Sequence, residues 1–372
     1  MKLSDLPDIE FVSSDAEEVK GWVLAKYKEV VGRTPAQGDP SRLFCLFMAE
    51  VFIRLLNDIN YTGKQNLLKY ALGDNLDHVG ALTSVDRIRA KAATTTLKAT
   101  LSAKRSQETV IDAGTRVASD TGLYFATDVD LIIPAGELIG VVKATCTKSG
   151  AEGNNFLPGE IATVIDPGAY VDSIANITTS AGGSGIEDDE AFRDRIHEAP
   201  ESFSVAGPEG AYRFFAKSVN ASIIDVGINS PEPGVVDIYP LLEGGELPGE
   251  EILTQVKDYL SDETRRPLTD KLSVKAPKAI NYEIDVSYYI DKEADASTVQ
   301  ANVAKAVSSY ELWQKSMIGR DINPSKLIAL MMEVAGVKRV VVAAPEFTVV
   351  ETDTSVAIAS SKSVKMAGSE DE

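Results

Sequence analysis

The sequence contains little histidine, cysteine or tryptophan, with two residues of each among 372. His78 and His197 belong to no His-Glu-x-x-His or Cys-x-x-Cys pattern, so a zinc site is not expected. Neither histidine accompanies a serine or cysteine nucleophile motif, so a catalytic triad is not expected either. Cys45 and Cys146 lie among apolar or small neighbours, which predicts buried free thiols and a reducing compartment.

Long apolar runs and a surplus of positive charge are also missing. The first residues contain no apolar core of signal-peptide length, and the most apolar stretch, residues 43–56, is interrupted by Glu50 and Arg54. We therefore expect no secretion signal and no membrane insertion. Acidic residues outnumber basic ones by 56 to 37, which gives a formal net charge of −19. Such a field repels nucleic-acid backbones and anionic membrane surfaces, so no nucleic-acid partner is expected.

The length and composition indicate a folded chain of several domains. A chain of 372 residues with 44% hydrophobic residues exceeds one ordinary core. Residues 1–90 show helical periodicity and predict a helical N-terminal domain that makes subunit contacts. Its first helix begins with a capping-box spacing at Ser14 and Glu17 and ends at Gly32.

The next predicted helix, from Ser41 to about Asp58, is apolar around most of its circumference. A small helical domain can hardly bury so much apolar surface, so part of it is a candidate contact with another subunit. The alternative is that other helices of the same chain cover it. The candidate interface residues are Leu43, Phe44, Phe47 and Phe52.

From about residue 92 the apolar period changes to two, with turn signals between short runs. This pattern predicts a β-rich domain over residues 91–175, a small sandwich or barrel. A junction loop, helix and linker follow at 176–206. Residues 207–372 alternate helices and strands and predict one or more C-terminal α/β sandwich-like domains, split near 277, with the acidic end at 368–372 unstructured. The fold class is therefore α+β and multidomain.

The stretch AGGSGIEDDEAFRDRI, residues 181–196, packs three glycines before four acids, Glu187 to Glu190. A phosphate cradle needs backbone N–H groups and a cation, whereas acids in the first helical turn occupy the anion position themselves. The acids could hold Ca²⁺ or Mg²⁺, but the alternating ligand spacing of a calcium loop is missing. A capped helix is the favoured interpretation, and no metal, cofactor or catalytic residue is assigned.

Several segments, in the right order, resemble the baseplate J-like proteins of contractile phage tails and contractile injection systems. In that family the Gly-Gly loop followed by acids and an Arg-x-Arg-Ile helix is the usual passage out of the β-rich domain. The resemblance covers roughly residues 70–290 and is carried by residues 73–90, 113–119, 124–127, 151–155, 171–196 and 265–277.

The resemblance implies a structural wedge subunit of a virion tail baseplate, made and assembled in the host bacterial cytoplasm. The implied partners are further copies of the chain in a six-fold ring, a second wedge protein, the central hub and spike, and sheath-side proteins. Two other classes remain open. A tail-associated cell-wall or polysaccharide-degrading enzyme could use the acids, although sugar clefts are typically rich in aromatic residues. A receptor-binding module would favour long β repeats.

Overall fold

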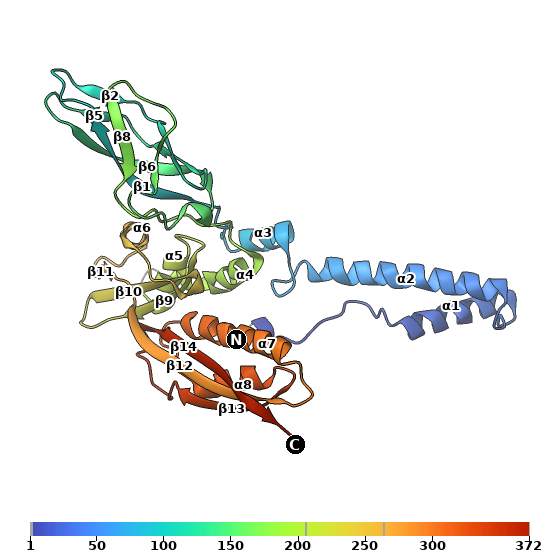
Figure 1. Ribbon diagram of the computed structural model, residues 1–372. Helices are drawn as coiled ribbons and strands as arrows, with labels where there is room; N and C mark the ends of the chain where they lie inside the picture. The colour runs from blue at the N-terminus through green and yellow to red at the C-terminus, as the bar shows by residue number, and fades with distance from the viewer. Residues whose placement is uncertain (1–2, 205–206, 263–264, 372) are drawn as a thin grey trace. The chain divides into compact units, whose positions relative to one another are not determined.

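The computed structural model describes residues 3–204, 207–262 and 265–371 and divides the chain into two compact units. The first unit comprises Met1–Arg87 and Phe192–His197, and the second comprises Ile88–Ala191 and Glu198–Glu372. Figure 1 shows helices in the first unit and a mixture of strands and helices in the second. The predicted α+β multidomain class is confirmed. Residues 205–206, part of the expected linker, lie outside the described residues.

The first unit contains a short 3₁₀ turn, three helices and residues 192–197 of a fourth helix: η1 (Leu3–Asp5), α1 (Ala16–Val31), α2 (Pro40–Lys64), α3 (Gly73–Ala81) and part of α4 (Asp189–Glu198). The carboxylate of Asp15 caps α1 by accepting the Glu18 N–H at 2.8 Å, so the predicted Ser14 cap is wrong by one residue. Helix α2 continues past the predicted end at Asp58 and ends at Lys64, because no glycine or proline follows Asp58 before Gly63.

Helices α1 and α2 form a hairpin with a small core. Its buried members are Val19 and Val23 from α1 and Cys45 and Ala49 from α2, whose spacing of four places them on one face of each helix. Cys45 is a buried free thiol, as is Cys146 in the second unit, which confirms the prediction that both thiols are buried and free. The core occupies only one face of α2.

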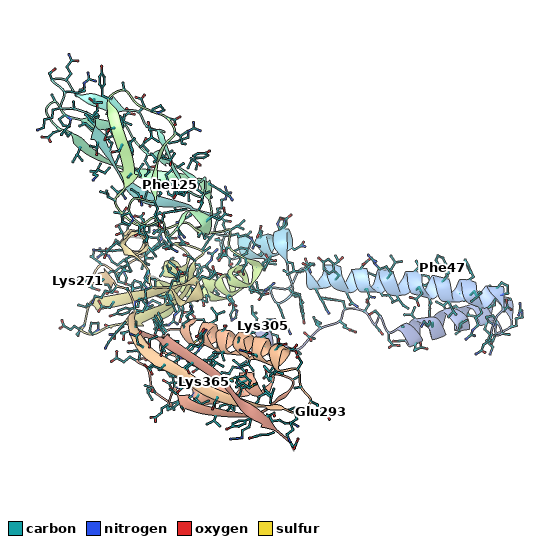
Figure 2. The ribbon with its side chains drawn as sticks, viewed as in Figure 1. Phe47, Phe125, Lys271, Glu293, Lys305 and Lys365 are labelled. Carbon is teal, nitrogen blue, oxygen red and sulfur yellow. The ribbon has the colours of Figure 1, made fainter. Side chains whose placement is uncertain are left out.

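The second unit begins with a nearly closed six-stranded sheet in the order β7-β3-β4-β6-β1-β8. The barrel-like sheet surrounds a core that includes Phe125, labelled in Figure 2. A separate two-stranded sheet pairs β2 with β5. The strands are β1 (Ala92–Leu101), β2 (Thr109–Ile111), β3 (Arg116–Ser119), β4 (Tyr124–Thr127), β5 (Leu131–Ile133), β6 (Ile139–Ser149), β7 (Ile161–Val164) and β8 (Val171–Asn176), with η2 (Ala151–Gly153) after β6.

The buried amide of Asn176 fastens β8 to the segment leading into β7. Its Oδ1 accepts the N–H groups of Gly159 and Ile161, both at 2.9 Å. Its Nδ2 donates to the carbonyls of Phe156, Leu157 and Thr178 at 3.4, 2.9 and 3.0 Å. One side chain thereby replaces part of the backbone ladder where the sheet curls round to meet itself.

Two further sheets of three strands each complete the second unit. The sheet β11-β10-β9 packs beneath α5 and α6 around Tyr212 and Ile238. Here the elements are α4 (Asp189–Glu198), η3 (Ala199–Phe203), α5 (Glu209–Lys217), β9 (Ile223–Asn229), β10 (Val235–Leu242), η4 (Glu243–Gly245), α6 (Glu250–Leu260) and β11 (Lys271–Val274).

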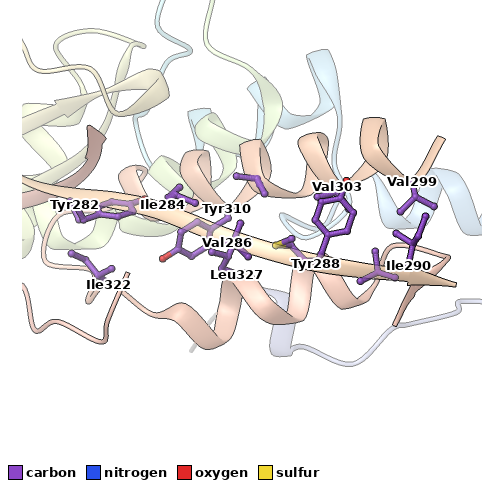
Figure 3. Close-up of a cluster of buried hydrophobic side chains, with 14 of the residues drawn as sticks. Tyr282, Ile284, Val286, Tyr288, Ile290, Val299, Val303, Tyr310, Ile322 and Leu327 are labelled. Carbon is purple, nitrogen blue, oxygen red and sulfur yellow. The ribbon is translucent and has the colours of Figure 1, made fainter. Parts of the chain in front are cut away.

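The last sheet, β13-β12-β14, is covered on one face by α7 and α8. Alternate residues of β12, from Tyr282 to Ile290, point into this core, as Figure 3 shows. The elements are β12 (Lys278–Asp291), α7 (Ala296–Lys315), α8 (Pro324–Met332), β13 (Val337–Ala344) and β14 (Ser355–Glu370). The prediction that the acidic end is unstructured is wrong up to Glu370, because β14 pairs in parallel with β12 through that residue and Glu370 pairs with Arg339.

Candidate functional site

Backbone hydrogen bonds join the glycine loop after β8, residues 181–185, to the start of β1. Thr94 donates its N–H to the carbonyl of Ala181 at 2.8 Å, and Ser184 donates to the carbonyl of Lys91 at 3.0 Å. The amide of Asn154 accepts from the N–H and donates to the carbonyl of Gly183, both at 2.8 Å. Residue 183 must be glycine, since a Cβ there would lie 2.4 Å from the Gly150 carbonyl oxygen.

Two of the four acids after the loop, Glu187 and Asp188, accept hydrogen bonds from backbone N–H groups. Glu187 is buried and accepts the N–H of Ile88 at 2.9 Å, and its own N–H donates to the Ile88 carbonyl at 3.0 Å. Asp188 caps α4 by accepting the N–H of Ala191 at 2.8 Å. Among the described residues no group of three or more His, Cys, Asp or Glu could hold a metal ion. The bond of Asp188 is the one expected from the capped-helix interpretation, whereas the bond of Glu187 joins the loop to Ile88.

The C-terminal part of α4 belongs to the first unit, and its two arginines satisfy backbone carbonyls there. Arg193, nearly fully buried, donates from Nε to the Leu68 carbonyl at 2.8 Å and from an Nη atom to the Ala71 carbonyl at 2.7 Å. Arg195 donates to the Asp86 carbonyl at 2.5 Å. Phe192 and Ile196 pack so closely beneath Gly80 that a Cβ at Gly80 would lie 2.7 Å from the Phe192 ring.

The structure separates the four candidate interface residues into two groups. Leu43, Phe44 and Phe47 are 62–63% exposed, and Figure 2 marks Phe47 on α2. Phe52 is half-buried in the hairpin, where its ring meets Trp22 edge-on with centroids 5.9 Å apart. The exposed stripe extends along the helix through Val51, Leu55 and Ile59, at intervals of four residues. Phe52 is therefore a packing residue of the hairpin.

The remaining chemical groups are dispersed. His78 lies in α3 and His197 in α4. Arg116 holds Asp166 with two guanidinium bonds of 2.9 Å, which lower the pKa of that carboxyl to about 2. Burial raises the pKa of Tyr310 to about 12, in the separate core of the last sheet. No helix among the described residues is long and apolar enough to cross a membrane.

Asn154 and Asn176 are structural residues whose distant backbone partners the sequence did not indicate. In the segment 151–155, Asn155 adopts a φ of 66°, which asparagine tolerates. Asn154 instead has φ of −81° and uses its amide on a loop 29 positions away. For Asn176 the available signal was an asparagine at the end of the β-rich segment, where a buried amide needs partners.

Three family models match consecutive parts of the chain. The baseplate J-like protein barrel domain matches residues 97–183, the baseplate J-like central domain matches 204–276, and the baseplate J-like protein C-terminal domain matches 282–364. They correspond in turn to the six-stranded sheet, to the sheet of β9–β11, and to the sheet of β12–β14.

One curated relative and one solved structure are similar to this chain. The chain is 30% identical over 187 residues to "Baseplate protein J" of Escherichia phage P2, which is 50% of this chain and 61% of the relative. A chain in the cryo-EM structure of the six-fold symmetrised anti-feeding prophage baseplate overlaps 92% of this chain and 90% of its own length, with 14% identity and a TM-score of 0.42. Three domain models in order and the phage relative show that the chain belongs to the baseplate J-like family of structural baseplate proteins.

Proposed function

We propose that this chain is a wedge subunit of a contractile tail or injection-system baseplate, and that copies of it associate in a ring around a central hub. Family membership supports the baseplate role, and the α2 stripe supports association. Heterologous contacts that close by rotation give rings, and six-fold closure is the expected form. A second wedge protein, the hub and spike, and sheath-side proteins are the proposed neighbours, in a virion tail assembled in the bacterial cytoplasm.

The observation that carries the proposal is the outer face of α2. The hairpin core takes one face of the helix, and the opposite face presents six apolar side chains, each at least 37% exposed. Burying a fully exposed Leu or Phe side chain contributes roughly 1.5–3 kcal/mol, so covering this stripe gives a large favourable term. The stripe members are Leu43, Phe44, Phe47, Val51, Leu55 and Ile59.

The test is a charge substitution on that face in the full chain. Phe44→Glu combined with Phe47→Glu should shift the protein to monomer in size-exclusion chromatography with light scattering, and should abolish co-purification with a co-expressed second wedge protein. The matched control is Phe203→Glu, because Phe203 is also an exposed phenylalanine outside α2. A wild-type chain that stays monomeric at high concentration and captures no neighbour would contradict the proposal.

An enzymatic role is the second candidate, and the comparisons favour it less. The relatives are structural baseplate proteins, and Glu187 and Asp188 use their carboxylates on backbone N–H groups. We therefore propose that the chain is not an enzyme. Zymography on peptidoglycan and on capsular polysaccharide tests this, and a clearing zone that Glu187→Gln removes would overturn it.

A further inference from the structure

A cleft of about 780 Å³ opens in the second unit between the glycine loop and the segment that leads into α6. Most of its lining comes from residues 94–96 of β1, from 178–188, and from 242–244, 246–247 and 249–252. Two hydrogen bonds hold the walls together. Asn220 donates from Nδ2 to the Gly182 carbonyl at 3.2 Å, and Lys91 donates from Nζ to the Val219 carbonyl at 2.6 Å.

The cleft has a strongly negative lining. Six carboxylates face one ammonium, that of Lys143. Glu187 and Asp188 already accept backbone N–H groups, and Glu251 accepts from the side-chain amide of Gln255. The other three, Glu243, Glu246 and Glu250, are exposed and make no ion pair within the described part of the chain.

The rest of the lining matches a long cationic side chain better than a small ion. The described residues hold no group of acids placed to bind a metal. Ile186 and Leu247 line the same cleft and are 65% and 40% exposed. Lysine and arginine cover apolar surface with their methylene stems while the charged head meets carboxylates, which is the combination that this lining offers.

A second, independent feature of the cleft is a hydroxyl without a partner. Ser184 lines the cleft and is 2% exposed, yet its Oγ makes no hydrogen bond. Buried polar groups are almost always paired, because leaving one unpaired costs about 1–3 kcal/mol. The side chains of Thr179 and Asn155, which also line the cleft, add groups that can bond an extended backbone.

We infer that this cleft binds an extended segment of another protein chain that carries lysine or arginine. The acids of 243–250 pair with its cationic heads, Ile186 and Leu247 contact the stems, and the hydroxyl of Ser184 receives a polar partner from its backbone. The cleft shares no residue with the α2 stripe, so a variant of one surface can lose binding while the other surface keeps it.

The test measures fluorescence anisotropy of the full chain with a labelled hexapeptide that alternates serine and arginine. The peptide should bind at about 50 mM NaCl and weaken strongly at about 500 mM, as screening of exposed charges requires. Combining Glu243→Gln, Glu246→Gln and Glu250→Gln should weaken binding about tenfold, since each exposed ion pair contributes modestly. Ser184→Ala should weaken it about threefold without lowering the thermal midpoint, because the hydroxyl has no partner to lose.

The matched control removes three negative charges elsewhere, with Glu232→Gln, Glu333→Gln and Glu346→Gln, all at exposed positions. It should bind the peptide as the wild type does, and so should the α2 charge variant. Equal weakening by the control, equal binding of a serine–glutamate hexapeptide, or loss of peptide binding to Mg²⁺ at matched ionic strength would overturn the inference. The inference would also be overturned if the triple variant at positions 243, 246 and 250 lost self-association and still bound the peptide.

Discussion

Replacing Asn176 by alanine should weaken the contact between β8 and the start of β7, which lie at the two ends of the six-stranded sheet. The N–H of Ile161, a fully buried residue, loses the partner shown for it, which costs about 1–3 kcal/mol. The Gly159 N–H keeps a second bond, to the Asn176 carbonyl at 2.9 Å. The carbonyls of Phe156 and Leu157 still accept the N–H groups of Ser180 and Glu160. Losing the hydrogen bonds that Asn176 Nδ2 donates therefore costs only about 1 kcal/mol in total. The expected loss is about 2–4 kcal/mol.

Hydrogen–deuterium exchange by mass spectrometry is the suitable assay, because it reports on the peptides of β7 and β8 separately from the rest of the chain. A loss of about 2–4 kcal/mol in the opening free energy accelerates their exchange by roughly 30-fold to 1,000-fold. Asn281→Ala is the matched control, since Asn281 lies on β12 with an exposed side chain. Acceleration below about threefold, or an equal effect of the control on the same peptides, would refute the role given to Asn176.

Three further predictions concern other contacts. Gly183→Ala forces a Cβ against the Gly150 carbonyl and should cost about 1–3 kcal/mol in chemical denaturation, whereas Gly185→Ala, with open space around it, should cost far less. Hydrogen bonds from Thr298 and Ser297 lower the pKa of Asp295 to about 2, below its ordinary 3.8, so its stabilisation is complete above pH 3.8 and disappears towards pH 2. Asp295→Asn should therefore flatten the fall in thermal midpoint across that window, and an unchanged slope would count against it. Tyr310→Phe removes an unpaired buried hydroxyl and should leave stability equal or up to about 1 kcal/mol higher, as thermal unfolding can measure.

Periodicity predicted the elements well where one face of the chain is apolar. The change from a period near four to a period of two at residue 92 coincides with the start of β1. The end of β14 was not predictable in this way, because its last residues are Gly, Ser and Glu and are held by pairing with β12. Local sequence does not record a strand partner 77 to 79 positions away.

At the acids after the glycine loop, the sequence predicted one contact and did not predict another. Acids before a helix predict a cap, and Asp188 is that cap. That Glu187 would instead turn back to Ile88, 99 positions earlier, depends on the loop already lying along β1. The apolar circumference of α2 was evident in the sequence, but the partial burial of Phe52 and the exposure of Phe47 depend on which face of α2 is covered by α1.

The first unit is assembled from two distant parts of the chain, and this has a consequence for the order of its synthesis. Residues 192–197 supply Phe192 under Gly80 and the arginine that holds the Leu68 and Ala71 carbonyls. A ribosome makes them only after every strand from β1 to β8. The N-terminal helices therefore emerge first, and the residues 192–197 that complete their packing follow more than a hundred residues later. An excised fragment that ends near residue 90 lacks these packing residues.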